Sequence, residues 1–154
     1  RWDDYDSTLF NKLKSKAQNN IKINSDIKIY GFDIAFQNIA ISLSSVKSIN
    51  LSHIVKFKKQ DIINFKPIEK NGIIMINPPY GERLSQSINE LENLYELIGD
   101  IFKTKCSGFN AYIFTSNLEA AKFIGLKSKK RIPLKNGKLD CRLLHYPIKE
   151  GQYK

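Results

Sequence analysis

The sequence of 154 residues has few side chains that form covalent or metal crosslinks. It contains two cysteines, Cys106 and Cys141, and two histidines, His53 and His145. One cysteine pair is too few for a disulfide scaffold in a chain of this length, and these four residues lack the spacing of a structural zinc site. We therefore expect reduced thiols, a cytoplasmic location and no metal.

Long apolar runs and flexible linkers are also missing. No stretch approaches the roughly 20 apolar residues that a membrane-spanning helix needs, and the first four residues lack the apolar core of a signal peptide. The 8 glycines are isolated, and no repeat or Pro/Gly/Ser-rich segment divides the chain. The sequence thus predicts a single soluble domain over residues 1–154, without membrane contact.

Positive charge, in contrast, is abundant. The sequence has 25 Lys and Arg against 15 Asp and Glu, a formal net charge of +10, and 42% of its residues are hydrophobic. That hydrophobic content supports a packed core and excludes wholesale disorder. The excess of cations favours a polyanionic partner, nucleic acid first and an anionic membrane second, because neutralised phosphates release counterions.

Strand and helix patterns alternate along the chain. Asp6 or Ser7 caps a first helix that ends near Gln18. Asn136-Gly137 is a strong hairpin signal between the last two strands. This order predicts a three-layer α/β sheet with helices on both faces and antiparallel final strands. Further predicted strands cover 27–32, 53–59, 72–76, 111–115, 127–132 and 139–146, and further helices cover 35–45, 88–105 and 118–124.

Polar residues follow three of the predicted strands. Asp33, Asp61 and Asn77 each stand where an apolar run ends. In α/β sheets, ligands bind at the carboxyl ends of the strands. We therefore expect these three side chains to line one crevice.

The segment Asn77-Pro78-Pro79-Tyr80 carries the clearest chemical signal. Its prolines prevent ladder pairing and helix, so the Asn oxygen and a Pro carbonyl form a pair of acceptors for an exocyclic amine. Tyr80 offers a flat face on which a flipped or single-stranded base can stack. An ordinary turn after a strand is the alternative interpretation, but the context favours methyl transfer to an amine.

Together with its flank, this segment resembles a known family. Residues 77–84 (NPPYGERL) are similar to the extended signature of the bacterial 23S ribosomal RNA guanine-N2 methyltransferases, which usually carry an N-terminal THUMP domain. Residues 135–141 (KNGKLDC) are similar to the terminal hairpin of the same family. The resemblance covers essentially the whole chain. It implies a Rossmann-like class I fold, S-adenosylmethionine as cofactor and ribosomal RNA as substrate.

The resemblance also assigns roles to residues. It implies that the catalytic loop is Asn77, Pro78, Pro79 and Tyr80, that Asp33 binds the cofactor ribose, and that Asp61 contacts the adenine amine beside a wall formed by Ile62. Alternative interpretations are a solvated acid or helix cap for Asp33 and a loop acid for Asp61. The second acid that the family often has is replaced by Ala35, which puts one cofactor contact in doubt.

A larger departure concerns the glycine-rich loop that cradles the methionine part of the cofactor in this family. No such loop occurs in the sequence. We therefore expect an N-terminally truncated catalytic domain, whose first central strand, glycine-rich loop and THUMP domain lie upstream of Arg1. The neighbours of that strand would lose their pairing partner, and the isolated piece would bind cofactor poorly.

Several cations are candidates for RNA contact. Arg83 reaches a phosphate or the base, or instead pairs with Glu82 or Glu90. The basic residues near the last two strands form either a solvated face or an RNA-backbone contact, and the second role predicts binding that weakens steeply with salt. These residues are Lys127, Lys129, Lys130, Arg131, Lys135 and Lys138.

Two other functions remain open from the sequence. An adenine-amine DNA methyltransferase would use the same loop, although the extension at 81–84 and the hairpin argue against it. A non-catalytic RNA-binding fragment would keep the acceptor loop without the cofactor loop. Since a methyl sulfonium is already activated, the enzyme needs positioning and desolvation, and we expect no catalytic Ser, Cys, His or metal.

Overall fold

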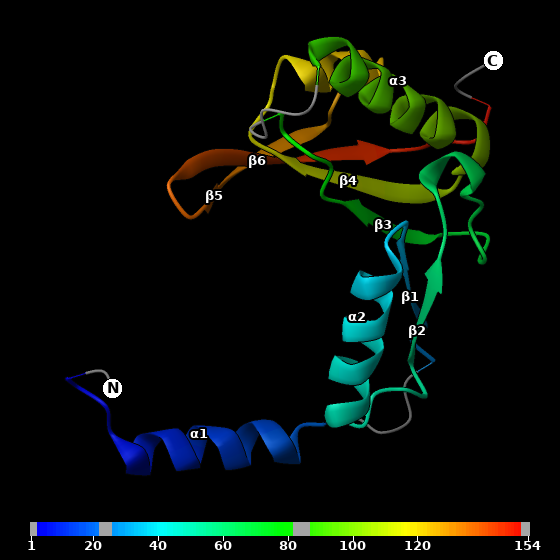
Figure 1. The fold of residues 1–154 in the computed structure, drawn as a ribbon. Helices are drawn as coiled ribbons and strands as arrows, with labels where there is room; N and C mark the ends of the chain where they lie inside the picture. Colours follow the sequence, from blue (N-terminus) through cyan, green and yellow to red (C-terminus); the bar gives the residue numbers. More distant parts are fainter. Residues whose placement is uncertain (1–2, 22–25, 82–86, 152–154) are drawn as a thin grey trace. The chain divides into compact units, whose positions relative to one another are not determined.

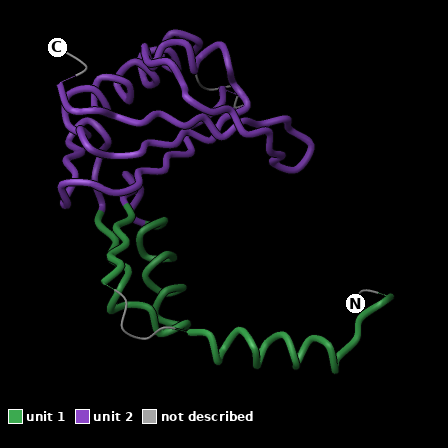
Figure 2. Tube along the Cα trace, turned by 180° about the vertical axis from the view of Figure 1, so that it is seen from behind, with its two compact units in different colours: residues 1–31, 37–58 green, residues 32–36, 59–154 purple. Residues whose placement is uncertain are grey.

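The computed structural model describes residues 3–21, 26–81 and 87–151. Figure 1 shows its helices and strands, and Figure 2 shows two compact units. Unit 1 comprises residues 1–31 and 37–58, and unit 2 comprises residues 32–36 and 59–154. Every predicted site residue that the structure describes belongs to unit 2.

Residues 3–21 and 26–59 form two helices and a pair of strands. Helix α1 (Ser7–Asn19) begins as predicted, because the Asp6 carboxylate accepts the Thr8 and Leu9 backbone N–H groups at 2.8 and 3.0 Å. Strands β1 (Ile29–Asp33) and β2 (Val55–Lys59) form a two-stranded sheet, and α2 (Phe36–Ser48) connects them. Ile29 N donates to Ile54 O and Gln60 N donates to Asp33 O, so the two strands run parallel.

Unit 2 contains a four-stranded sheet in the order β3-β4-β6-β5. Strands β3 and β4 are parallel, whereas β4–β6 and β6–β5 are antiparallel, as predicted for the end of the chain. Asn136 pairs with Leu139, which leaves Gly137 and Lys138 as the turn, with Gly137 at φ +59°. The strands are β3 (Gly72–Ile76), β4 (Phe109–Thr115), β5 (Lys130–Asn136) and β6 (Leu139–Pro147).

Strand β5 lies later than the sequence pattern predicted. The apolar pattern indicated a strand over 127–132, but the structure places it at Lys130–Asn136. Every residue of β5 is exposed, so its bounds are set by backbone pairing with β6 rather than by burial. Pro133, which lacks an N–H, is tolerated because β5 is an edge strand.

Helix α3 (Ile88–Lys105) covers one face of this sheet and has the predicted bounds. A capping box starts it: Ser87 Oγ accepts Glu90 N–H and the Glu90 carboxylate accepts Ser87 N–H. Its inward side chains, Leu91, Tyr95, Ile98 and Phe102, are buried in a cluster with residues of β4 and β6. This cluster is the hydrophobic core of unit 2.

A short 3₁₀ helix, η2 (Ala120–Ile124), packs against α3 where the sequence predicted a helix over 118–124. Gly99 makes the contact close: a Cβ at this position would lie 2.0 Å from the carbonyl oxygen of Ile124. Only glycine leaves room for backbone at this crossing. The close approach therefore fixes η2, and the loop leading into it, against the core.

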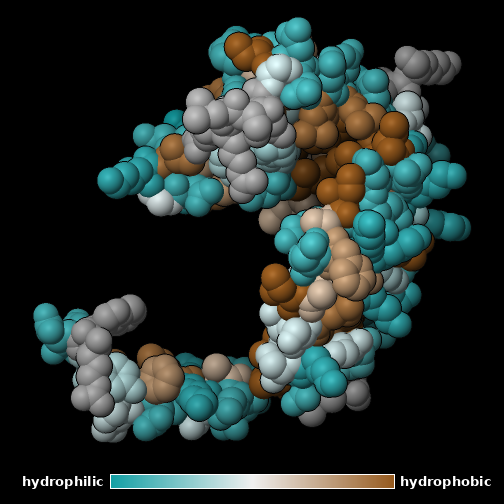
Figure 3. Space-filling model, in the orientation of Figure 1, coloured by the Kyte–Doolittle hydropathy of each residue, from teal (hydrophilic) through white to brown (hydrophobic). Residues whose placement is uncertain are grey.

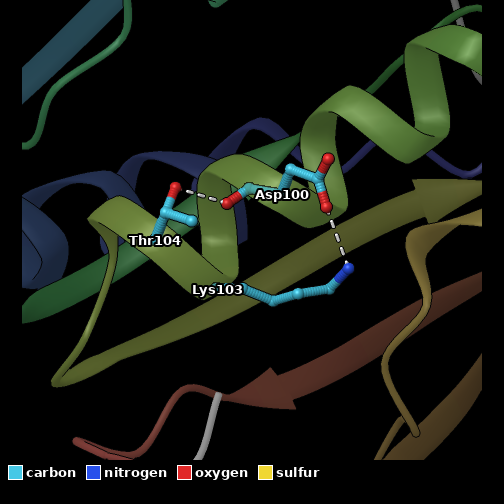
Figure 4. Close-up of polar contacts among 3 residues, drawn as sticks. All are labelled: Asp100, Lys103 and Thr104. Atoms are coloured by element: carbon cyan, nitrogen blue, oxygen red, sulfur yellow. Dashed lines mark hydrogen bonds and ion pairs between the residues drawn. The ribbon is translucent and has the colours of Figure 1, made fainter. Parts of the chain in front are cut away.

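The outer side of α3 is polar (Figure 4). Lys103 Nζ pairs with the Asp100 carboxylate at 3.0 Å, and Thr104 Oγ1 donates to the Asp100 carbonyl at 2.6 Å. Because the Asp100 side chain is 60% exposed, such a pair contributes little to stability. The helix is therefore held mainly by its inward face.

The predicted strands all form, and in the described residues they occupy two sheets, β1-β2 and β3-β4-β6-β5. This separation is compatible with the expectation that a central strand between their neighbours is missing. On the face of the larger sheet opposite α3, Ile73 and Met75 of β3 are 72% and 66% exposed.

Helix α2 runs to Ser48, three residues beyond the predicted end. No helix in residues 3–21, 26–81 and 87–151 is long and apolar enough to cross a membrane.

Candidate active site

The ends of β1 and β2 bring the two predicted cofactor acids close together. Asp33 is the last residue of β1, and its carbonyl accepts the Gln60 N–H at 2.9 Å, next to Asp61. Beside them, the ring of Phe32 packs edge-on against Phe65, with centroids 5.5 Å apart. The structure thus places both acids at the carboxyl end of the parallel strand pair. That they line one crevice with Asn77 stays a prediction.

Each of these acids also shapes the backbone that follows it. Asp33 Oδ1 accepts the Ala35 N–H at 2.7 Å, and Asp61 Oδ1 accepts the Ile63 N–H at 3.0 Å at the start of η1 (Ile62–Asn64). The alternative interpretation of both residues, an acid that caps a turn or helix, therefore describes part of what they do. A carboxylate has two oxygens with about four acceptor sites, so a ligand-binding role is compatible with these bonds.

Ile62, the predicted wall of an adenine pocket, is half-buried against the core of unit 2. The turn that carries it is tied to α3, because Lys105 Nζ donates to the Ile63 carbonyl at 3.3 Å. The position of Ile62 is therefore set by packing. Its contact with a cofactor stays a prediction.

The loop Asn77–Tyr80 follows β3 directly, and its side chains contact one another. The Tyr80 hydroxyl donates to Asn77 Oδ1 at 2.5 Å. The Tyr80 ring packs edge-on against Phe114, with centroids 6.3 Å apart and planes at 82°. Asn77 and Pro79 are exposed, whereas Pro78 is buried. The loop therefore presents an amide oxygen beside an aromatic ring.

Sequence reasoning missed two residues that hold the backbone of this loop, Tyr95 and Asn117, and a third, Thr115, that bonds to both of them. The Tyr95 hydroxyl donates to the Pro79 carbonyl at 3.3 Å and lies 2.7 Å from Thr115 Oγ1. Asn117 Nδ2 donates to the Tyr80 carbonyl at 3.0 Å. One signal was present in the sequence: a tyrosine on the inward stripe of a helix needs a partner for its hydroxyl.

Only the first residue of the predicted extension at 81–84 is described. Gly81 has φ +82°, and a Cβ there would lie 2.9 Å from Leu91 Cδ2, so both the backbone and the space require glycine. Arg83 lies outside the described residues. Its predicted contact with substrate or with a neighbouring acid therefore remains a prediction.

The cysteines and histidines do not assemble into a chemical site in the part of the chain that is described. No group of three or more metal-ligating side chains occurs there. Cys106 and Cys141 are buried free thiols, and burial raises the pKa of Cys106 to about 11. The His145 ring stacks on the Tyr112 ring and shares a hydrogen bond with Asn110 Oδ1. Burial lowers the pKa of His145 most, and the positive charges of Lys129 and Lys130 lower it further.

The basic hairpin consists of β5, β6 and their turn, with the preceding residues 127–129. All seven residues of β5 are exposed. Lys135 Nζ lies 3.8 Å from the Asp140 carboxylate, an exposed pair that contributes little to stability, and Arg131 Nε donates to Ser128 Oγ at 3.0 Å. The hairpin therefore displays positive charge on an exposed edge strand.

Named relatives resemble nearly all of this chain. It is 30% identical over 148 residues to a candidate RNA methyltransferase of Synechocystis sp., covering 96% of this chain and 38% of that protein. It is 32% identical over 142 residues to the ribosomal RNA large subunit methyltransferase K/L of Legionella pneumophila, covering 92% of this chain and 20% of that protein. The chain thus spans between about a fifth and two-fifths of these relatives.

Solved structures agree with the sequence relatives. A candidate methyltransferase complexed with SAH superposes with a TM-score of 0.82 at 26% identity, covering 98% of this chain and 40% of that one. A candidate methylase from Clostridium difficile 630 gives 0.81 at 29% identity, covering 99% and 40%. The predicted Rossmann-like class I methyltransferase fold is thereby confirmed. Because residues 4–145 match the family described as "RMKL-like, methyltransferase domain", the chain belongs to that methyltransferase family.

Proposed function

We propose that this chain is the catalytic part of an enzyme that transfers a methyl group from S-adenosylmethionine to the N2 amine of a guanine in 23S ribosomal RNA. The observation that carries the proposal is the loop Asn77–Tyr80 at the carboxyl end of β3, where an amide oxygen lies beside an aromatic ring. Relatives named as ribosomal RNA methyltransferases support an RNA substrate. Such a substrate places the reaction in the cytoplasm.

The residues at the ends of β1 and β2 fit the nucleoside part of the cofactor. Vicinal ribose hydroxyls are donors that suit the Asp33 carboxylate, and an adenine amine suits Asp61, with Ile62 as an apolar wall. The bond from Gln60 N to the Asp33 carbonyl holds the two acids at the same strand end. When bound, S-adenosylmethionine supplies a methyl group already activated by its sulfonium.

The loop residues act on the target amine. Its nitrogen attacks the methyl carbon, the N–C bond forms as the C–S bond breaks, S-adenosylhomocysteine leaves, and the extra amine proton passes to water. Asn77 Oδ1 accepts an amine N–H, which stabilises positive charge as it builds on the nitrogen. An amide oxygen has two lone pairs, so it can accept this bond and the Tyr80 hydroxyl together.

The remaining parts of the enzyme belong to the same proposal. We place a further strand, a glycine-rich loop for the methionine part of the cofactor and a THUMP domain upstream of Arg1. In support, β3 has a ladder partner only in β4 among the described residues, and the relatives are two and a half to five times as long as the segment they share with this chain. The basic hairpin and Arg83 contact the RNA backbone.

Substitution of Asn77 tests the proposal in the full-length protein. Asn77→Ala should lower turnover by roughly 100-fold or more, the effect of removing one donor or acceptor aimed at developing charge, while RNA affinity stays nearly unchanged. Asn71→Ala is the matched control, because Asn71 is an exposed residue at the opposite end of β3. Equal losses of turnover and RNA affinity in Asn77→Ala would contradict the assigned role.

Product analysis separates the proposed reaction from the alternatives. Nucleosides from treated 23S RNA are digested and examined by mass spectrometry, and calorimetry measures binding of S-adenosylhomocysteine to the wild-type protein and to Asp33→Asn. We expect N2-methylguanosine in the RNA, and cofactor binding that weakens in Asp33→Asn. Double-stranded DNA treated in parallel is the second substrate, and N6-methyladenine in it without N2-methylguanosine in the RNA would replace the proposal with a DNA enzyme. Absence of cofactor binding would leave an RNA-binding protein.

A further inference from the structure

Three polar side chains from separate parts of unit 2 meet beneath the loop Asn77–Tyr80. Tyr95 lies on α3, Thr115 ends β4, and Asn117 precedes η2. Tyr95 and Thr115 are both 0% exposed, although each carries a hydroxyl. We call these three residues the loop anchor. None of them has a role in the proposed chemistry so far described.

The hydrogen bonds of the loop anchor have one consistent direction. The Tyr95 hydroxyl donates its single proton to the Pro79 carbonyl, so in the 2.7 Å contact between Tyr95 and Thr115 the threonine is the donor. Thr115 Oγ1 in turn accepts the Asn117 N–H at 3.0 Å. Every donor therefore has an acceptor, with no conflict along the chain of bonds.

Asn117 completes the arrangement with both ends of its amide. Its Nδ2 donates to the Tyr80 carbonyl at 3.0 Å, and its Oδ1 accepts the Ala120 N–H at 2.8 Å. The second bond fixes which end of the amide faces the loop. Burial raises the pKa of Tyr95, which keeps its hydroxyl protonated as a donor.

The two anchored carbonyls are the natural points at which to hold this loop. Pro78 and Pro79 have no N–H, so a carbonyl is the only backbone hydrogen-bonding group that either residue offers. The anchored carbonyl of Tyr80 belongs to the residue whose hydroxyl reaches Asn77 Oδ1. Fixing the backbone at Pro79 and Tyr80 therefore also fixes the amide oxygen and the aromatic ring.

We propose that Tyr95, Thr115 and Asn117 are positioning residues, which hold the Asn77 oxygen and the Tyr80 ring in the geometry that the methyl-accepting amine requires. This inference rests on the proposed function of the loop. The physical reason is that in-line transfer depends on position, so a displacement of about 1 Å at the reacting groups costs up to roughly 100-fold in rate. The loop anchor acts on kcat through Asn77 and touches no substrate itself.

Tyr95→Phe and Thr115→Val in the full-length protein test this role, since each removes one hydroxyl and keeps the shape of the side chain. We expect kcat for RNA methylation to fall by roughly 10- to 100-fold, with the KM for RNA and the Kd for S-adenosylhomocysteine unchanged. Thr115→Ser, which keeps the hydroxyl, should restore most of kcat. A rise in KM at constant kcat, or no rescue by serine, would overturn the proposal.

Matched controls exist in the same unit. Tyr146 is a core tyrosine, 3% exposed, that forms no part of the loop anchor, and Thr104 donates its hydroxyl to the Asp100 carbonyl on the outer side of α3 (Figure 4). Tyr146→Phe and Thr104→Val should leave kcat at the wild-type value. Losses in these controls equal to those of Tyr95→Phe and Thr115→Val would show a general effect of core stability and overturn the proposal.

A second measurement separates this inference from the proposed function, because it needs no methylation. Chymotrypsin cleavage after Tyr80, followed by mass spectrometry, reports opening of the loop. Tyr95→Phe should be cleaved about fivefold faster than Tyr146→Phe, as expected when one hydrogen bond that holds the loop is lost. Equal cleavage rates would overturn the loop anchor. If the wild-type protein methylated no RNA, the proposed function would fail and the cleavage rates would still decide the anchor.

Discussion

The two units of this chain differ in what their apolar side chains contact. In unit 2, α3, η2 and the four-stranded sheet enclose a continuous buried cluster. In unit 1, Ile39 is the single buried residue among those described, and Leu9, Phe10 and Leu13 of α1 are at least half exposed. Figure 3 shows apolar surface over α1 and α2. An amphipathic pattern therefore stabilises a helix only where a complementary apolar surface covers it.

The largest expected difference between the units comes from truncating one apolar side chain in each. Phe102→Ala should lower the free energy of unfolding by about 3–5 kcal/mol, because it opens a cavity at a fully buried position. Leu13→Ala on α1, where the side chain is 56% exposed, should change it by less than about 0.5 kcal/mol. Urea unfolding measures both. Comparable losses would show that another surface covers α1.

Alkaline pH should also act through the core of unit 2. Burial raises the pKa of Tyr146 from 10.0 to about 12, and that of Cys106 from 9.0 to about 11. The folded state therefore favours the protonated forms of these two groups. Their contribution to the free energy of unfolding is fully present below about pH 9 and is lost as the pH rises from about 9 to about 12. Urea midpoints measured across this range should fall. If the urea midpoint of Tyr146→Phe fell by the same amount across this range, Tyr146 would be excluded as a source of the pH dependence.

The glycines of the two units should tolerate a methyl group differently. Gly99→Ala should cost about 1–3 kcal/mol, since the new Cβ would lie 2.0 Å from a backbone oxygen of Ile124. Gly31→Ala places a Cβ 2.4 Å from the Phe57 ring, a side chain that can rotate away, so the loss should be smaller. Thermal unfolding of the two variants measures this difference. A larger loss in Gly31→Ala would mean that Phe57 is rigidly held.

Helix caps provide the smallest effect and the finest comparison. Asp6 and Ser87 both accept N–H groups in the first turn of their helices. Ser87→Ala should lower the free energy of unfolding by about 1 kcal/mol, because α3 belongs to the cooperative core. Asp6→Ala should reduce only the helical circular dichroism signal, since α1 has no buried residue. An equal shift of the urea midpoint in both variants would indicate that α1 unfolds together with unit 2.

Local signals in the sequence determined much of the fold and the central loop of the site. The apolar stripe and the cap of α3, the run of β3 and the Asn136-Gly137 turn depend on neighbouring residues, so they were predicted at or close to their observed bounds. The loop at Asn77 was predicted for the same reason, because a buried strand followed by two prolines has few conformations. The acids at the ends of β1 and β2 were likewise predictable from strand patterns.

Only the tertiary structure decided the rest. Strand β5 lies at Lys130–Asn136 rather than at the predicted 127–132. Pairing with β6 sets its bounds, because an exposed strand has no burial pattern in its sequence that would mark them. The loop anchor was not predictable, since Tyr95 and Asn117 meet the loop from 16 and 37 residues away. Burial of one amphipathic helix and exposure of another also depend on partner surfaces. Hydrogen bonds and packing between distant segments have no local signature in the sequence, so only folding brings their partners together.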